Sequence, residues 1–336
     1  MVITRTPFRM SFFGGGTDFP GYFKEYGGSV LSTSFDKYCY VTVKHLPQFF
    51  DYKNQVTYSK IERCKSVDSI EHPAVRNAMK YLNMDEIIMS YDADLPGRSG
   101  LGTSSSFAVG MLEAFHALKG EYVDKRKLAE EAIYLERNLC GESGGWQDQI
   151  AASFGGLNRI DFTDDSFTVN PVVIDRQRRN LLNDSLMLFF TGFTRFSSDV
   201  SKKQTRAIKE KLSELSEMRQ LVFQAEKILT DKNSDLNEFG RLLDYTWKLK
   251  RGITSEISTD SIDSFYKKGL DAGALGGKLL GAGGGGYLLF FVERDKQQSV
   301  KEALSELTYV PFHFESDGTK VLYYKSEDFF KEAKNV

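Results

Sequence analysis

The sequence has few cysteines, no excess of either charge and no long apolar run. Its three cysteines, Cys39, Cys64 and Cys140, are widely spaced and form no CxxC pair, so neither a zinc site nor a disulfide framework is indicated. This cysteine usage favours a reducing, cytoplasmic location. The longest apolar runs, which begin at Leu186 and Tyr287, are too short to span a bilayer, and the first residues lack the apolar core of a signal peptide. We therefore expect no association with a membrane.

The charge balance and the missing motifs exclude several classes of protein. With 44 basic and 46 acidic side chains the net charge is -2, which leaves no basic excess for binding a nucleic acid. The chain has no GxxxxGK[ST] segment and no HRD or DFG triplet. These absences exclude a P-loop nucleotide-binding protein and a protein kinase on motif grounds.

Length and pattern together predict an α+β protein in two lobes. At 336 residues the chain is longer than a single core usually grows, so two domains are expected. The expected strands and helices are mixed without a regular βαβ alternation, which favours the α+β class. The polar segment 163–184 is predicted to be irregular and to hold the boundary, which gives domains at 1–180 and 181–336. We predict strands at 2–3, 10–13, 30–35, 38–44, 87–91, 158–162 and 185–191, and helices at 103–118, 124–140, 200–229, 236–251 and 261–272.

The most informative stretch combines glycines with hydroxyl residues. Three glycines let the backbone turn tightly and approach a ligand without interference from Cβ atoms. The hydroxyl residues stand at the predicted start of a helix, where free N–H groups and the positive end of the helix dipole favour an anion. A phosphate-bearing ligand is therefore indicated, although glycine and serine alone are also typical of a loop that caps a helix. The stretch reads Pro96, Gly97, Arg98, Ser99, Gly100, Leu101, Gly102, Thr103, Ser104, Ser105 and Ser106.

Two acidic residues and a second glycine-rich stretch are further candidates. Glu136 shares a predicted helix face with Ile133, and a buried carboxylate is costly unless it is bound to a metal or, as the alternative, paired with a basic side chain. Asp148 follows two glycines that can present it on a tight turn, although a lone Asp in such a place is more often a helix cap. Five glycines within residues 281–286, before an apolar run, indicate a close approach of the backbone to another group.

In their order these pieces resemble the GHMP kinase superfamily, which is named for galactokinase, homoserine kinase, mevalonate kinase and phosphomevalonate kinase. The likeness rests on three motifs: PFRMSFFGGGTDF at 7–19, LPGRSGLGTSSS at 95–106 and KLLGAGGGGYLLF at 278–290. The resemblance implies a two-lobed fold with the active site in the cleft between the lobes. It also implies a kinase that uses ATP and Mg²⁺ to phosphorylate a small molecule.

The resemblance also assigns roles to residues at matching positions. It implies that residues 96–105, named above, wrap the ATP phosphates and that Ser104 shares Mg²⁺ with Glu136. Asp148 matches the catalytic base, and Arg9 matches the basic partner of that base in sugar kinases. The remaining implied roles are sugar binding by Gly15, Gly16 and Asp18, and support of the active site by Gly283, Gly284 and Gly285.

The first motif departs from the galactokinase pattern. Galactokinases carry Glu-His where this chain has Gly15 and Gly16, so two sugar contacts are missing and galactose is a doubtful acceptor. The GGGTDF form, together with GGLNRIDF at 155–162 and FFTGFTRFSSDV at 189–200, is similar to the D-glycero-D-manno-heptose 7-phosphate kinase branch. It is also similar to the kinase part of L-fucokinases.

The expected partner is a small molecule, either a sugar or a sugar phosphate, and the expected product is a sugar 1-phosphate. For an acceptor with its own phosphate, Arg195 is the preferred ligand because arginine offers a planar, bidentate set of donors. Lys24 and Arg76 are weaker candidates and are otherwise ordinary surface charges. Three alternatives stay open: a 1-kinase for L-fucose or another sugar, a non-catalytic sensor of sugar and ATP, and an isoprenoid kinase.

Overall fold

The computed structural model describes residues 1–47, 49–97, 99–192, 203, 205–254, 257–281 and 283–326. Two predicted site residues, Arg98 and Arg195, lie outside this described part of the chain. The strands are β1 Val2–Phe13, β2 Gly28–His45, β3 Asn54–Thr57, β4 Ile61–Cys64, β5 Ile87–Ala93, β6 Leu157–Thr163, β7 Ser166–Pro171, β8 Leu186–Phe190, β9 Ala274–Leu279, β10 Tyr287–Val292, β11 Thr308–Val310, β12 Phe314–Glu315 and β13 Lys320–Tyr324. The helices are α1 Pro20–Tyr26, α2 Pro73–Tyr81, α3 Thr103–Leu118, α4 Lys125–Tyr134, α5 Gln147–Phe154, α6 Arg176–Ser185, α8 Leu212–Thr230, α9 Asn237–Arg251, α10 Asp260–Asp271 and α11 Gln297–Ala303, with 3₁₀ turns at Val67–Ser69, Ile208–Glu210 and Arg294–Lys296 and a π turn at Leu135–Leu139.

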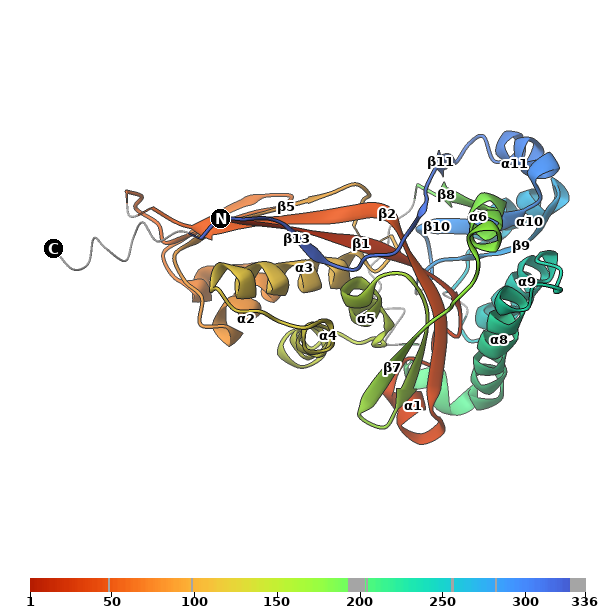
Figure 1. The fold of residues 1–336 in the computed structure, drawn as a ribbon, viewed down its shortest axis with the longest axis horizontal. Helices are drawn as coiled ribbons and strands as arrows, with labels where there is room; N and C mark the ends of the chain where they lie inside the picture. The colour runs from red at the N-terminus through yellow and green to blue at the C-terminus, as the bar shows by residue number, and fades with distance from the viewer. Residues whose placement is uncertain are drawn as a thin grey trace.

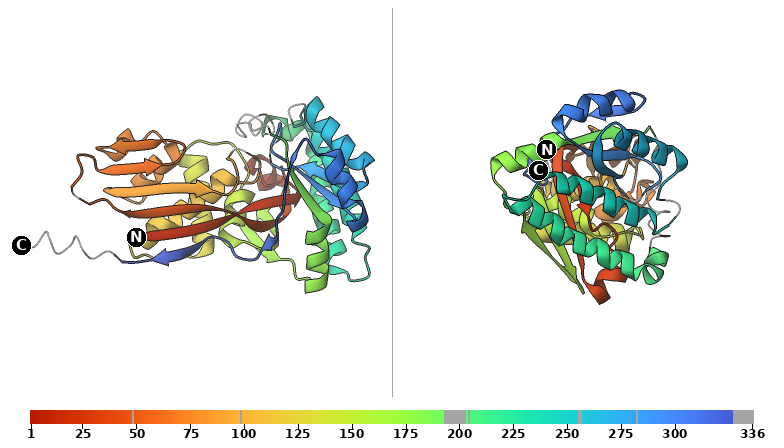
Figure 2. Two further views of the ribbon diagram at one scale, coloured as in Figure 1. Left: turned by 90° about the horizontal axis from the view of Figure 1, so that it is seen from above. Right: turned by 90° about the vertical axis from the view of Figure 1, so that its right-hand side faces the viewer.

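Within the described residues the strands form two sheets, one for each lobe. The larger sheet has the order β13-β1-β2-β5-β3-β4, with β12 and β6 also paired to β2 and β7 paired to β6. The smaller sheet has the order β11-β8-β10-β9. Figure 1 shows α2, α3, α4 and α5 on one side of the larger sheet, while α8 to α11 gather around the smaller sheet at the other end of the molecule. Seen from above in Figure 2, β1 and β2 run from the first lobe into the second. This arrangement confirms the predicted two-lobed α+β class.

The two longest strands correct the prediction of four short ones. The sequence predicted separate strands at 2–3 and 10–13, and at 30–35 and 38–44, but β1 and β2 are continuous and pair antiparallel along their length. Polar Thr4 and Thr6 interrupt the apolar pattern of β1, yet both are buried: Thr4 donates to the Gly110 carbonyl at 2.9 Å, and Thr6 hydrogen-bonds Thr319. The register shifts after Pro7 and again after Ser11, and such bulges bend a strand without ending it.

The helices agree with the prediction in some places and not in others. Helix α3 begins and ends at the predicted residues, α9 begins one residue later than predicted, and α10 begins and ends one residue earlier than predicted. The predicted helix 124–140 is α4, capped by Asp124, followed by a π turn. The described part of 200–229 is helical from Leu212 after a 3₁₀ turn. Segment 163–184, predicted to be irregular, instead holds β7 and most of α6, because β7 pairs with β6 and the Asp175 side chain caps α6.

The two lobes share one apolar core. Phe12 and Phe13 of β1 contact Phe239 of α9 edge-on, with ring centroids 5.4 and 5.1 Å apart. The chain also returns to its beginning, since β12 pairs with β2 and β13 pairs with β1 after the second lobe is complete. The division into 1–180 and 181–336 stays a prediction, and the pairing adds that Phe314–Glu315 and Lys320–Tyr324 lie in the sheet of the first lobe.

Candidate active site

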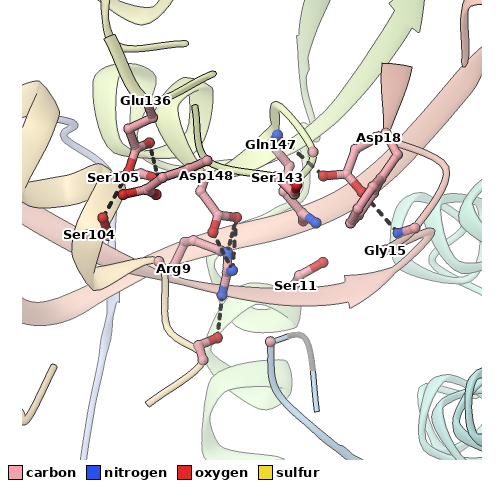
Figure 3. Close-up of a pocket in the computed structure, with 18 of the residues that line it drawn as sticks. Arg9, Ser11, Gly15, Asp18, Ser104, Ser105, Glu136, Ser143, Gln147 and Asp148 are labelled. Atoms are coloured by element: carbon pink, nitrogen blue, oxygen red, sulfur yellow. Dashed lines mark hydrogen bonds and ion pairs between the residues drawn. The ribbon is translucent and has the colours of Figure 1, made fainter. Parts of the chain in front are cut away.

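A cavity of about 160 Å³ lies where the two lobes meet. The first lobe contributes the middle of β1, the loop before α1, the start of α3 and the start of α5, and the second lobe contributes the end of α9 and the end of β9. Figure 3 shows three groups of side chains around it: Glu136 with Ser104 and Ser105, Arg9 with Asp148, and Asp18 beside Gly15. The sequence predicted that all of these residues belong to one site. Figure 3 also labels three residues that the sequence did not place there: Ser11, Ser143 and Gln147.

Arg9 and Asp148 form a bidentate ion pair at the centre of this site. The Nε and Nη2 atoms of Arg9 each donate to one oxygen of Asp148 at 2.8 Å. The third donor, Nη1, binds the carbonyl of Gly100 at 2.7 Å. Arg9 is buried, whereas the Asp148 side chain keeps 26% of its surface exposed to the cavity. The guanidinium therefore fixes the direction of the carboxylate and leaves it accessible to a ligand.

Glu136 is a buried carboxylate held by neutral donors. Ser104 and Ser105 donate to its two oxygens at 2.8 and 2.7 Å, and Gln149 donates to one of them. Glu136 lies in the π turn that follows α4, a widened turn that often marks a functional site. No basic side chain among the described residues lies within salt-bridge distance of it, so the alternative of an ordinary ion pair is not what the structure shows.

The donor set around Glu136 fits a magnesium ion. Mg²⁺ takes oxygen ligands and in kinases is usually held by one or two protein groups together with substrate phosphates and water. Glu136 supplies a carboxylate and Ser104 a hydroxyl on the same wall of the cavity. In the described part of the chain no cluster of three or more His, Cys, Asp or Glu side chains forms a metal site by itself. Any divalent ion bound here therefore depends on oxygens from the substrates.

The first turn of α5 joins the three groups of side chains. Gln147 donates its main-chain N–H to Asp18 at 3.4 Å, Asp148 pairs with Arg9, and Gln149 donates to Glu136. Three consecutive residues thus each contact a different part of the site. The predicted alternative role of Asp148 as a helix cap does not fit, since the residue lies inside α5 and no side-chain cap is formed there.

The glycine–serine loop leads into the N-terminus of α3 at the cavity wall. Gly102 has a φ of 73°, in the left-handed region that glycine adopts readily, and precedes the first residue of the helix. Thr103, Ser104 and Ser105 line the cavity, so the free N–H groups of the first helical turn lie beside it. Arg9 and Asp148 are close to this turn, because a Cβ atom on Gly102 would be 3.3 Å from Arg9 and 3.5 Å from Asp148.

The second glycine-rich stretch packs against the back of this loop. A Cβ atom on Gly281 would be 2.3 Å from the Cα atom of Gly100, and one on Gly286 would be 2.2 Å from the carbonyl oxygen of Ser99. Only glycine permits this approach of two backbones. Gly284 donates its N–H to the carbonyl of Ile257 at 3.0 Å, which holds the stretch in the second lobe. The predicted supporting role of Gly283, Gly284 and Gly285 is compatible with this packing and stays a prediction.

Four described residues of the loop, Pro96, Gly97, Ser99 and Leu101, are not in the cavity wall. Ser99 donates to the carbonyl of Pro96 at 2.7 Å, and Leu101 is buried in the apolar core. Gly97 has open space where a side chain would lie. Their predicted contacts with ATP phosphates stay predictions.

Asp18 is buried at the opposite end of the site from Glu136. One of its oxygens accepts a hydrogen bond from the N–H of Gly16 at 2.9 Å, and Asp18 is 1% exposed. Burial, together with the negative charge of Asp148, raises the pKa of Asp18 above its ordinary value. A Cβ atom on Gly145 would lie 1.8 Å from an oxygen of Asp18, so Asp18 can occupy this position only because residue 145 is glycine.

The absence of a side chain at Gly15 leaves polar groups facing an open position. A Cβ atom there would be 3.7 Å from the Ser11 hydroxyl, 3.7 Å from the Gln147 amide nitrogen and 3.9 Å from the Lys250 ammonium. The Ser11 hydroxyl oxygen and the Gln147 amide oxygen are buried and have no hydrogen-bond partner among the described residues. These orphaned groups fit a ligand that carries several hydroxyls.

Sequence reasoning missed eight side chains in the cavity wall, which are Ser11, Phe19, Arg137, Glu142, Ser143, Gln147, Lys250 and Lys278. One signal was present, since Lys278 stands at the start of the third motif and interrupts a strand that is otherwise made of small and apolar residues. Lys250 falls on the apolar face of α9, three residues after the buried Trp247, where a charged residue is unexpected. The two weaker phosphate candidates do not line the cavity: Lys24 pairs with Asp165 and Arg76 donates to the carbonyl of Ile70.

Comparison with known families identifies the class of protein. Residues 70–156 match the GHMP kinases N terminal domain, and residues 225–309 match the GHMP kinases C terminal domain. The chain is 30% identical over 336 residues to the D-glycero-alpha-D-manno-heptose 7-phosphate kinase of Campylobacter jejuni, covering 95% of this chain and 98% of that one. The protein belongs to the GHMP kinase family, as its three motifs predicted.

More distant relatives are also sugar kinases. The chain is 26% identical to the L-fucokinase/L-fucose-1-P guanylyltransferase of Bacteroides fragilis, and the match covers 90% of this chain but 35% of that longer protein. It is 28% identical to the galactokinase of Pyrococcus furiosus over 63% of this chain and 66% of the relative.

Solved structures show the same fold. A D-glycero-D-manno-heptose 1-phosphate kinase from B. thetaiotaomicron superposes with a TM-score of 0.79 at 25% identity, covering 97% of this chain and all of the other. The mevalonate kinase of Methanococcus jannaschii superposes with a TM-score of 0.71 at 18% identity, over 93% of this chain and 98% of that one, which bears on the fold alone.

Together the family and its relatives define the activity at a coarse level. The protein is a sugar kinase that transfers phosphate, with ATP as the phosphate donor. Its relatives at 25–30% identity include kinases of sugar phosphates. None of the helices in the described ranges has the length and apolar character needed to cross a bilayer.

Proposed function

We propose that this enzyme transfers the γ-phosphoryl group of ATP to the anomeric hydroxyl of D-glycero-D-manno-heptose 7-phosphate and forms the 1,7-bisphosphate. The observation that carries the proposal is the cavity itself, in which one carboxylate, Asp148, lines the wall together with the N-terminus of α3 and the polar pocket at Gly15. The relative from Campylobacter jejuni, which matches almost the whole chain, supports the choice of acceptor.

The donor side of the site is suited to the phosphates of ATP. The first turn of α3 and the loop before it present N–H groups and the positive end of the helix dipole to an anion. Ser104 and Glu136 would hold Mg²⁺, which, when bound, neutralises negative charge on the phosphate oxygens. Residues 96–105 would complete this half of the site.

Asp148 is the proposed proton acceptor. The acceptor oxygen forms a bond to the γ-phosphorus, the bond from that phosphorus to the bridging oxygen breaks, and ADP leaves with the bonding electrons. The proton of the attacking hydroxyl passes to Asp148, which Arg9 holds in a fixed direction through two hydrogen bonds. Arg9 also binds the Gly100 carbonyl of the glycine–serine loop, so a hydroxyl bound to Asp148 would lie near that loop.

The acceptor side offers groups for sugar hydroxyls. The Ser11 hydroxyl, the Gln147 amide and the Lys250 ammonium surround the space that a side chain at residue 15 would fill, and Asp18 lines the same cavity. In galactokinases, by the resemblance, a Glu-His pair stands at positions 15 and 16, so the glycines make room for a larger acceptor. Arg195 remains the proposed ligand for the distal phosphate on sequence grounds.

The test is a comparison of acceptors by ADP release. Heptose 7-phosphate, heptose 1-phosphate, unphosphorylated heptose, mannose and L-fucose are measured under identical conditions with ATP and Mg²⁺. Since one charge-assisted contact contributes about 1.5–3 kcal/mol, kcat/KM for heptose 7-phosphate should exceed that for unphosphorylated heptose by roughly 10- to 150-fold. Equal or better use of any unphosphorylated sugar, L-fucose included, would overturn the choice of acceptor while leaving the sugar kinase activity in place.

Arg195→Ala tests recognition of the distal phosphate separately from recognition of the rest of the acceptor. The variant should lower kcat/KM for heptose 7-phosphate by the same roughly 10- to 150-fold and leave the affinity for ADP unchanged. Lys24→Ala is the matched control, because Lys24 is a surface lysine already paired with Asp165 and distant from the cavity wall. An equal loss for heptose 7-phosphate and unphosphorylated heptose would remove Arg195 from the phosphate site.

A further inference from the structure

Two buried ammonium groups line the cavity without a carboxylate partner. Lys250 at the end of α9 and Lys278 in β9 are 6% and 2% exposed. Each donates to a main-chain carbonyl, Lys250 to Gly281 at 2.6 Å and Lys278 to Phe12 at 2.8 Å. Among the residues that the structure describes, no carboxylate lies within 4.0 Å of either nitrogen. Buried ammonium groups without an opposing charge are costly, so an anion in this cavity would stabilise them.

Lys250 lies at the reacting end of the site. Its acceptor, Gly281, packs directly against Gly100, since a Cβ atom on Gly281 would be 2.3 Å from the Gly100 Cα. The carbonyl of Gly100 accepts a hydrogen bond from Arg9, which in turn holds Asp148. Lys250 and Arg9 therefore bind neighbouring pieces of backbone, one from the second lobe and one from the first.

The electrostatics of the cavity agree with this geometry. Burial, opposed by Asp18 and Asp148 and reinforced by Arg9, lowers the pKa of Lys250 to about 8. Burial also holds the pKa of Lys278 well below its usual value, with additional repulsion from Lys250 and Arg9. Three buried basic side chains thus share one small cavity, which the partly buried Arg137 also lines. Of these four, only Arg9 has a carboxylate bound to it within the described chain.

We propose that Lys250 and Lys278 form a subsite for the phosphoryl group in transfer. Lys250 donates hydrogen bonds to its oxygens, and Lys278 is a positioning residue that adds a second positive charge. The proposal rests on the kinase chemistry at Asp148 described above, in which the acceptor oxygen bonds to the γ-phosphorus, ADP leaves and the hydroxyl proton goes to Asp148. Lys250 keeps its protons throughout and stabilises the negative charge that the three equatorial oxygens carry.

The position of Lys250 favours this phosphoryl group over the phosphate of the acceptor. In a heptose 7-phosphate the anomeric hydroxyl and the 7-phosphate are separated by the length of the sugar, so a ligand of the distal phosphate lies away from the catalytic base. Lys250 instead lines the same cavity as Asp148, Asp18 and Arg9 and is close enough for all three charges to change its pKa. The attacking hydroxyl and the phosphoryl group in transfer both lie beside Asp148, and of these two the phosphoryl group is the anion.

The test compares Lys250→Met, Lys250→Arg and Lys278→Met with the wild type in steady-state kinetics and in ligand binding. Lys248→Met is the matched control, since Lys248 is on the same helix, is exposed and pairs with Asp244. Each protein is measured with the acceptor that the wild type uses best. If that acceptor is not heptose 7-phosphate, the substrate proposal fails on its own while the lysine variants are still compared. Binding of ADP alone reports that each variant is folded.

Lys250→Met should lower kcat by roughly 10- to 100-fold, with the acceptor KM and the affinity for ADP changed by about threefold at most. Binding of ADP with aluminium fluoride, which imitates the planar phosphoryl group, should weaken by the same factor as kcat. Lys250→Arg should restore part of both, and Lys278→Met should show a smaller loss in the same two quantities. The Lys248→Met control should match the wild type.

Three results would overturn the proposal. An unchanged kcat in Lys250→Met, with unchanged binding of the aluminium fluoride complex, would show that Lys250 does not contact the group in transfer. A loss confined to the KM of phosphorylated acceptors would assign Lys250 to the phosphate of the acceptor instead. A variant that binds ADP normally but loses all activity, without any rescue by Lys250→Arg, would also contradict a role based on positive charge.

Discussion

On the first-lobe wall of the cavity, the acidic groups are already satisfied: Asp148 accepts two hydrogen bonds from Arg9, and Glu136 accepts hydrogen bonds from three neutral side chains. On the second-lobe wall, Lys250 and Lys278 donate to main-chain carbonyls, and no described carboxylate is bound to them. The two acidic groups therefore have partners without a ligand, and the Ser11 hydroxyl and the Gln147 amide oxygen, which stay unpaired on this wall, are neutral. The second wall retains positive charge that only an anion in the cavity would balance.

This difference matches the division of labour expected in phosphoryl transfer. Groups that bind a metal or accept a proton must be held in fixed directions before the substrates arrive, and hydrogen bonds within the first lobe provide this. Groups that stabilise the moving phosphoryl are most effective when nothing else neutralises them. The cost is paid in folding stability, because a buried ammonium group without a partner opposes folding at neutral pH. Changes on each wall should therefore have different signatures.

The largest effect is expected on the first wall, from Asp148→Asn. The amide keeps the shape of the carboxylate but cannot accept the hydroxyl proton, so turnover should fall by at least about 10²-fold, the usual size of a lost general base. The affinity for ADP should change little, because Asp148 forms its hydrogen bonds with Arg9 and not with the glycine–serine loop before α3. Steady-state kinetics and ADP titration measure the two quantities.

Asp165→Asn is the control for this change, since Asp165 is a surface carboxylate paired with Lys24. It should leave turnover at the wild-type value. A kcat of Asp148→Asn near that of the wild type would remove Asp148 from the mechanism.

A smaller effect on the same wall is expected from Glu136→Gln. The substitution preserves hydrogen bonding to Ser104 and Ser105 but removes the charge that attracts Mg²⁺. Loss of one charge-assisted interaction predicts a rise of roughly 10- to 150-fold in the Mg²⁺ concentration that gives half-maximal activity. The KM of the sugar should stay within about threefold, and a titration with Mg²⁺ at saturating acceptor measures the first quantity.

Glu130→Gln serves as the control, because Glu130 is an exposed residue of α4 that pairs with Arg126. The assignment fails if Glu136→Gln changes the sugar KM and leaves the Mg²⁺ requirement where it was. Glu136 would then belong to the acceptor side of the cavity.

The sequence predicted the first wall much better than the second. Arg9, Glu136 and Asp148 belong to motifs, and glycines or hydroxyls near them in sequence announce a ligand. Lys250 has no such surroundings: it stands between other basic residues, Lys248 and Arg251, and its place in the cavity depends on how the second lobe packs against β1. A single helical position cannot reveal a contact that tertiary packing creates.

The fold shows the same limit. Helix α3 was predicted at both ends because Gly102 and the hydroxyl residues mark its start. The continuity of β1 was missed because Thr4 and Thr6 look like a polar break, and their partners, Gly110 and Thr319, are distant in the sequence. The π turn at Glu136 gave no local signal either, since its residues are ordinary helix formers.

The last expected effect is on the second wall, and it concerns the free energy of unfolding rather than catalysis. Burial lowers the pKa of Lys250 from 10.5 in the unfolded chain to about 8 in the folded one, while Asp18 and Asp148 raise it and Arg9 and Lys278 repel the charge. Because the pKa is lower in the folded protein, the charged form of Lys250 opposes folding. This penalty is absent above pH 10.5, grows as the pH falls, and is complete once the pH has fallen through 8. Near pH 7 the protonated ammonium therefore costs up to about 3 kcal/mol of folding free energy, which Lys250→Met removes.

Lys250→Met without ligands should accordingly be more stable than the wild type at pH 7, with a difference that shrinks steadily as the pH rises from about 8 towards 10. Urea unfolding at a series of pH values measures this difference, with Lys248→Met as the control because the Lys248 side chain is on the same helix and is exposed. A phosphate-bearing ligand should reverse the order at pH 7, since it supplies the missing negative charge to the wild type alone. If Lys250→Met is less stable than the wild type at pH 7, or if the difference between them does not depend on pH, the lysine is not an unbalanced charge. The contrast between the two walls would then be one of hydrogen bonding only.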